Sequence, residues 1–81
     1  GESISQKSKN KIRKIITSNK NVLDVTSLKI VSIGTSSYLA LISIDYLDKL
    51  TDKEIVNLNK ELINEIQDVD SSVSEIYFNP K

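Results

Sequence analysis

The chain of 81 residues contains no Cys, His, Met or Trp, and only two Gly and one Pro. Without Cys it has no disulfide framework, zinc finger, iron–sulfur cluster or thiol nucleophile. Without His it has no Ser-His-Asp triad and no imidazole metal ligand. Its two glycines cannot form a phosphate-binding loop of the Walker or dinucleotide type. Catalysis would rest on carboxylates, Lys or Tyr, and because no arranged carboxylate pair is evident, we expect a protein that is not an enzyme.

The length predicts a single small domain spanning residues 1–81. At this size folding buries only about 60% of the surface that the unfolded chain exposes, so one sheet layer against one or two helices is expected. A membrane-spanning helix needs about 20 mostly apolar residues. The best run, residues 31–44, is interrupted by the polar turn sequence GTSS. The chain therefore shows neither a spanning segment nor a secretory signal.

The first 20 residues carry six basic side chains and a single acid, Glu2. Within them, Ile12, Ile15 and Ile16 have the i, i+3, i+4 spacing of one helical face. A short basic helix over residues 5–18 is therefore predicted. Such a charge block is typical either of a solvated face or of a surface that meets a polyanion. The predicted basic face comprises Lys7, Lys9, Lys11, Arg13 and Lys14.

Residues 26–46 predict a β-hairpin around the GTSS turn. In its first strand Val31 and Ile33 share one face by simple alternation. In its second strand we place Leu39 and Leu41 on the inner face. The register stays open, because a slip of one residue reverses the two faces of a strand.

A second helix is predicted to begin at Thr51, whose hydroxyl and the side chain of Glu54 match a capping box. An apolar stripe at spacings of three and four residues follows. A last strand over residues 73–78 ends before Pro80, which has no amide hydrogen to donate. The order α-β-β-α-β predicts an α+β fold, a two-layer ferredoxin-like sandwich of two helices and a mixed three-stranded sheet. A right-handed crossover would bring the last strand beside the first.

A sheet this small leaves its edges and one face partly uncovered. Its apolar side chains exceed what the helices can cover, and burying them in a homodimer would remove the exposed apolar surface. The candidate interface residues are Val31, Ile33 and Tyr77.

Four segments, in order, are similar to sequences of one transporter family. They are IRKII at 12–16, NVLDVTSLK at 21–29, LTDKEI at 50–55 and VSEIYFNP at 73–80. With Gly34 in the hairpin, they make the chain resemble the C-terminal cytoplasmic domain of the cation diffusion facilitators, membrane proteins that export divalent metals such as zinc, iron or manganese. The resemblance covers nearly the whole chain.

The resemblance implies a metallochaperone-like domain that follows the last transmembrane helix and pairs with its twin at the cytoplasmic face of the membrane. In many members, metal bound by these domains draws them together and favours transport. The transmembrane part would precede this chain, and the basic helix would lie near anionic lipid, where each Lys or Arg is attracted by about 1 kcal/mol.

The sequence departs from the family at the metal ligands. Positions where members often carry His or an acid fall on Thr26, near Ile42, and on Val56, Tyr77 and Asn79. None of these side chains replaces imidazole, and zinc prefers nitrogen and sulfur ligands. We therefore expect no cofactor in this domain, beyond weak binding of a divalent metal. The implied function is a constitutive dimerisation scaffold that has lost metal-driven closure.

Two alternatives stay open. A weak oxygen site for a hard cation is conceivable at Asp45, Asp48, Asp52 and Glu54, although helix capping already accounts for the last two. The chain could instead be a freestanding α+β module that binds nucleic acid or protein through its basic helix. Nucleic acid is not expected as a partner. Sheets that bind RNA present aromatic residues together with Arg or Lys, whereas Lys29 is the only basic residue on the predicted strands.

Overall fold

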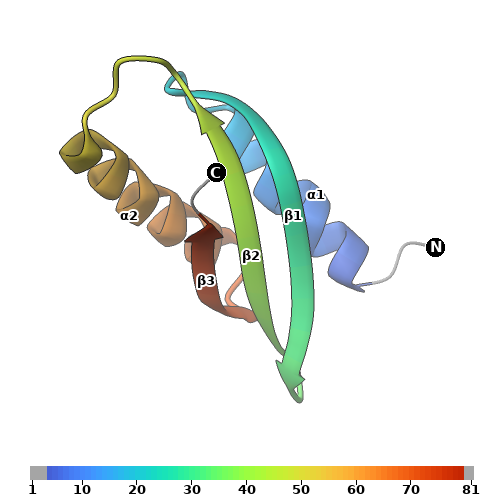
Figure 1. Cartoon of the computed structure of the whole chain (residues 1–81). Helices are drawn as coiled ribbons and strands as arrows, with labels where there is room; N and C mark the ends of the chain where they lie inside the picture. The colour runs from blue at the N-terminus through green and yellow to red at the C-terminus, as the bar shows by residue number, and fades with distance from the viewer. Residues whose placement is uncertain (1–3, 80–81) are drawn as a thin grey trace.

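A computed structural model describes residues 4–79 and confirms the α-β-β-α-β order. Two helices and a three-stranded mixed sheet form two layers (Figure 1). The elements are α1 (Ile4–Thr17), β1 (Val22–Gly34), β2 (Ser37–Tyr46), α2 (Asp52–Val69) and β3 (Val73–Asn79). Within this described part, neither helix is long and apolar enough to cross a membrane.

The central strand of the sheet is β2, which pairs antiparallel with β1 and parallel with β3. The predicted neighbour of the last strand was therefore wrong, because β3 lies beside β2 and not beside β1. The hairpin occupies one edge of β2 and leaves its other edge open. The chain returns along α2 to that open edge, where the Tyr38 amide donates to the Ser72 carbonyl at 2.9 Å.

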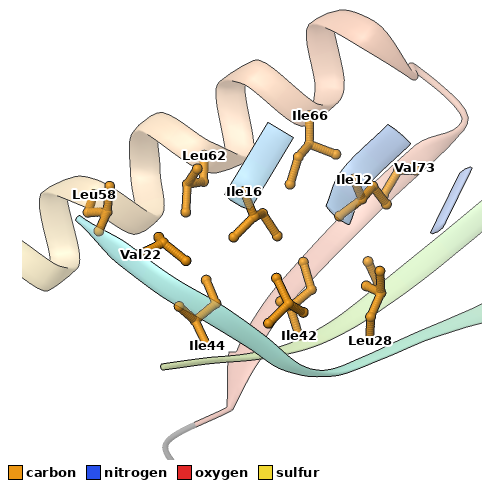
Figure 2. Close-up of a cluster of buried hydrophobic side chains, with 12 residues drawn as sticks. Ile12, Ile16, Val22, Leu28, Ile42, Ile44, Leu58, Leu62, Ile66 and Val73 are labelled. Atoms are coloured by element: carbon orange, nitrogen blue, oxygen red, sulfur yellow. The ribbon is translucent and has the colours of Figure 1, made fainter. Parts of the chain in front are cut away.

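Both helices pack on one face of the sheet, and the core lies between them and the strands (Figure 2). Ile12 and Ile16 of α1 and Leu62 and Ile66 of α2 are fully buried there. Ile12 and Ile16 belong to the helical face predicted from the sequence, whereas Ile15, predicted on the same face, is only partly buried. From the sheet, the buried residues are Val22, Val25, Leu28, Ala40, Ile42, Ile44 and Val73.

The structure overturns the predicted faces of β2. Ala40, Ile42 and Ile44 point into the core, so Leu39 and Leu41 lie on the opposite, outer face. The alternation explains the choice, because Leu39 and Leu41 share their face with Asp45, and an inner position for these leucines would bury that carboxylate among apolar side chains.

Side-chain hydrogen bonds fix both ends of α2. At its start Thr51 and Glu54 form the predicted capping box, and their two reciprocal bonds measure 3.0 and 3.1 Å. At its end the Asp70 carboxylate accepts from the hydroxyl of Ser8 at 2.7 Å and from the hydroxyl of Ser72 at 2.5 Å. Ser8 is a buried residue of α1, so this carboxylate ties the first helix to the end of the second.

Candidate functional site

The outer face of the sheet carries an apolar strip that no element of residues 4–79 covers. Val31 pairs with Leu39, and Leu41 pairs with Tyr77 across β2 and β3. Val31 is 45% exposed and Tyr77 is 50% exposed, and Ile33, at the end of β1, is 45% exposed. The three interface candidates named from the sequence therefore lie at the surface, and the sequence analysis missed Leu39 and Leu41 beside them.

The positions corresponding to metal ligands in the resembled family do not converge on one point. Thr26 lies on β1, and its hydroxyl donates to the Ser43 carbonyl at 3.2 Å. Ile42 is fully buried in the core, whereas Val56 is half exposed on α2. The described residues include no group of three or more His, Cys, Asp or Glu side chains placed to hold a metal ion.

Tyr77 is no better suited to bind a metal. Its hydroxyl donates to a carboxylate oxygen of Glu75 at 3.0 Å. This hydrogen bond, with the charge of Glu75, raises the pKa of Tyr77. A phenol binds metal most strongly after losing its proton, so the raised pKa works against binding. The loss of the family's metal ligands in this chain stays a prediction.

The four acids of the alternative oxygen site are divided between two settings. Glu54 is engaged at the helix start, where hydrogen bonds from the backbone and hydroxyl of Thr51 lower its pKa. Asp52 is the first residue of α2. Asp45 and Asp48 instead line a hollow between the sheet and α2. Weak cation binding by these four residues stays a prediction.

The basic residues of α1 are accessible, with Lys7, Lys11, Arg13 and Lys14 exposed and Lys9 partly buried. The Arg13 guanidinium makes a long contact of 3.5 Å to the Val25 carbonyl. The exposed lysines give α1 a positively charged surface. The first turn of this helix contains no acidic residue.

No protein-family model matches the sequence, and neither does any curated protein. Solved structures do match the fold. A variant of the MamM C-terminal domain in its nickel form superposes with a TM-score of 0.83 at 12% identity, covering 94% of this chain and 95% of that one. A variant in its cadmium form gives 0.85 at 13% identity, covering 98% and 96%.

A third solved structure, a doubly substituted MamM C-terminal domain, gives a TM-score of 0.84 at 13% identity. It covers 95% of this chain and 94% of the other. The structural neighbours are thus C-terminal domains of a cation diffusion facilitator, the family that the sequence resembles. At this level of identity the likeness establishes that the chain has the fold of these domains.

Proposed function

We propose that the chain is the cytoplasmic domain of a divalent-cation transporter of the cation diffusion facilitator family, and that it acts as a constitutive dimerisation scaffold. Two observations carry the proposal. The fold agrees with MamM C-terminal domains over nearly the full length of both chains, and the four similar sequence segments occur in the same chain in the family's order. The domain would have a regulatory role and no catalytic one.

The outer face of the sheet supports the dimer. Leu39, Leu41 and Val31 form an apolar strip with Tyr77, and an exposed apolar strip framed by polar residues is typical of an interaction surface. A second copy would bring an identical strip, as a two-fold interface requires. Leu41 and Tyr77 would contribute apolar contacts to this interface and no strong metal ligand. Pairing through the strip would therefore not depend on metal.

Membrane attachment is supported by the charge of α1. The helix starts at the first described residue and carries Lys7, Lys11 and Lys14 on accessible positions. A preceding transmembrane region would place these side chains at the cytoplasmic membrane surface, where positive segments are favoured. Anionic lipid would hold the domain there by about 1 kcal/mol for each basic residue close to the surface.

Sedimentation equilibrium tests the scaffold directly. We expect the mass to approach twice that of the monomer as the protein concentration rises, with the same curve in chelator, in zinc and in manganese. A monomer at all concentrations would contradict the scaffold. A dimer that dissociates in chelator would show that metal drives assembly and would direct mutagenesis to Asp45 and Asp48.

Two matched variants locate the interface. Val31→Asp places a charge on the outer face, at a side chain that is 45% exposed. Val56→Asp places the same charge on α2, at a side chain that is 50% exposed. The first should weaken dimerisation by tenfold or more, because a carboxylate would lose its water in the interface; the second should leave it unchanged. Equal effects would exclude the outer face.

The basic surface of α1 favours a second candidate, a freestanding module that binds nucleic acid. Such binding would weaken steeply as salt rises, since each phosphate contact releases a counterion. A salt-dependent complex with RNA or DNA that is lost in Lys7→Gln/Lys11→Gln would support this candidate. Binding to anionic vesicles without binding to nucleic acid would favour the transporter domain.

A further inference from the structure

The outer face of the sheet carries opposite charges on the two sides of its apolar strip. Lys29 lies on β1 and Glu75 lies on β3, the two strands that flank β2 (Figure 1). Both side chains are exposed. Their chain neighbours Leu28 and Ile76 pack on the core side, so the alternation of a strand directs Lys29 and Glu75 outward. The strip is therefore bordered by a base on one side and by an acid on the other.

The register of the sheet fixes where these charges lie along the strip. Lys29 pairs with Leu41, and Leu41 pairs with Tyr77, so the three form one row across the sheet. Glu75 is one row away, beside Leu39, but its carboxylate accepts a hydrogen bond of 3.0 Å from the Tyr77 hydroxyl. This bond holds the negative charge next to the Tyr77 side chain. The carboxylate thus lies beside one end of the row, and the base lies at the other end.

Two identical outer faces can meet in two ways that differ in which charges meet. A two-fold axis parallel to β2 lays β1 of one copy over β3 of the other, so each Lys29 faces the partner's Glu75. An axis across the strands instead lays β1 over β1 and β3 over β3, which brings like charges together. Facing sheets pack about 10 Å apart, a gap that a lysine and a glutamate side chain together can span. Charge complementarity therefore favours the first arrangement.

We propose that the outer face binds the outer face of a second copy about a two-fold axis parallel to β2, with Lys29 of each copy paired to the partner's Glu75. This inference rests on the proposed scaffold and adds the orientation of its two copies. An apolar contact centred on Leu41 would supply the affinity. The two ion pairs would border this contact on both sides and select the orientation, which is the usual contribution of charges at an interface.

The acidic end of the outer face limits the contact. Asp24 and Asp45 pair with each other across β1 and β2, and about the same axis they would approach the same acids of the second copy. The row of Ser27 and Ser43 separates them from the row of Leu41. Contact between the two sheets is therefore expected to end at the serine row, where the acids beyond it keep their water.

A charge swap tests this orientation without changing the net charge. In Lys29→Glu/Glu75→Lys each copy again presents one acid and one base, so this double variant should dimerise with itself as the parent does. A dimer of one parent chain and one variant chain would place base over base and acid over acid. We expect its dissociation constant to exceed that of either homodimer by about tenfold. Both replaced side chains are exposed, and urea unfolding would check that the fold is retained.

Native mass spectrometry measures how the chains sort. The parent chain, labelled with ¹⁵N, would be mixed with the unlabelled double variant and left to exchange. Heterodimer should fall well below its statistical share, and this preference should fade as salt screens the charges. The control swap Lys20→Glu/Glu61→Lys replaces exposed residues outside the sheet and should form heterodimers with the parent in the statistical share.

The outcomes separate this inference from the scaffold. Statistical mixing of the parent with Lys29→Glu/Glu75→Lys would overturn the orientation and leave the scaffold standing. A heterodimer above its statistical share would also overturn the orientation, because it would show that Lys29 faces the partner's Lys29. Monomers in every sample would contradict the scaffold itself, and the orientation with it.

Discussion

The hydrogen bond between Ser8 and Asp70 gives a sharp prediction about how α1 and α2 are held together. The Ser8 hydroxyl is 2.7 Å from the Asp70 carboxylate, and the Ser8 side chain is buried. Burial alone would raise the pKa of Asp70, but hydrogen bonds from Ser72 and Ser8, with the charge of Lys11, outweigh it and lower the pKa below 3.8. The charged carboxylate is therefore the form that stabilises the fold.

The magnitude follows from two opposing effects of Ser8→Ala. A net hydrogen bond to a charged group contributes about 1.5–3 kcal/mol, and the lower end applies because Asp70 is only partly buried. Alanine recovers about 0.5 kcal/mol through its higher helix propensity. We expect Ser8→Ala to lower the free energy of unfolding by about 1 kcal/mol at pH 7.

A double-mutant cycle isolates this bond. Unfolding in urea would be measured for the parent chain, Ser8→Ala, Asp70→Ala and the double variant. The coupling energy should be about 1.5 kcal/mol at pH 7, because the helix propensity of alanine cancels in the cycle. Because the folded pKa of Asp70 is lowered, its contribution is fully present above the unfolded pKa, near 3.8, and is lost as pH falls through the folded value. A coupling near zero at pH 7, or one that persists after Asp70 is protonated, would refute the reasoning.

Three further predictions rest on local contacts. Ile16→Ala removes a fully buried side chain from the core, and urea unfolding should show a loss of about 2–5 kcal/mol; a loss below about 1 kcal/mol would mean that the helix–sheet core is poorly packed. Thr51→Ala should cost about 1 kcal/mol by removing the cap of α2, and an NMR titration should show the pKa of Glu54 rising toward its ordinary value. Tyr46→Phe removes the hydroxyl bonded to Asn59 and should cost about 1 kcal/mol in urea unfolding, whereas Tyr38→Phe, whose hydroxyl lies outside the hollow, should cost less.

The local elements could be predicted from the sequence because their causes are local. The spacing of Ile12 and Ile16 fixed the buried stripe of α1, and Thr51 with Glu54 fixed the start of α2. Ordinary alternation also grouped Val31 and Ile33 on one face of the hairpin, and both side chains are exposed. Each of these features depends on side chains within one or two turns or along one strand, so periodicity and capping chemistry were sufficient.

The same local rules left the faces of β2 undetermined. Both sets of alternating residues in this strand are largely apolar, so hydrophobicity alone did not separate Leu39 and Leu41 from Ala40 and Ile42. The packing of two helices against one face decided between them. Asp45 on the face of the two leucines was the one signal in the sequence that pointed the right way, because a charge is costly to bury.

Tertiary structure alone decided the order of the strands and the composition of the candidate sites. Pairing of β3 with β2 brought Tyr77 beside Leu41 and joined Phe78 to Ile44 around the hollow, although these residues are far apart in the chain. The Ser8–Asp70 bond likewise links positions 62 residues apart. Such contacts follow from how whole elements pack, and no short stretch of sequence contains the information that fixes them.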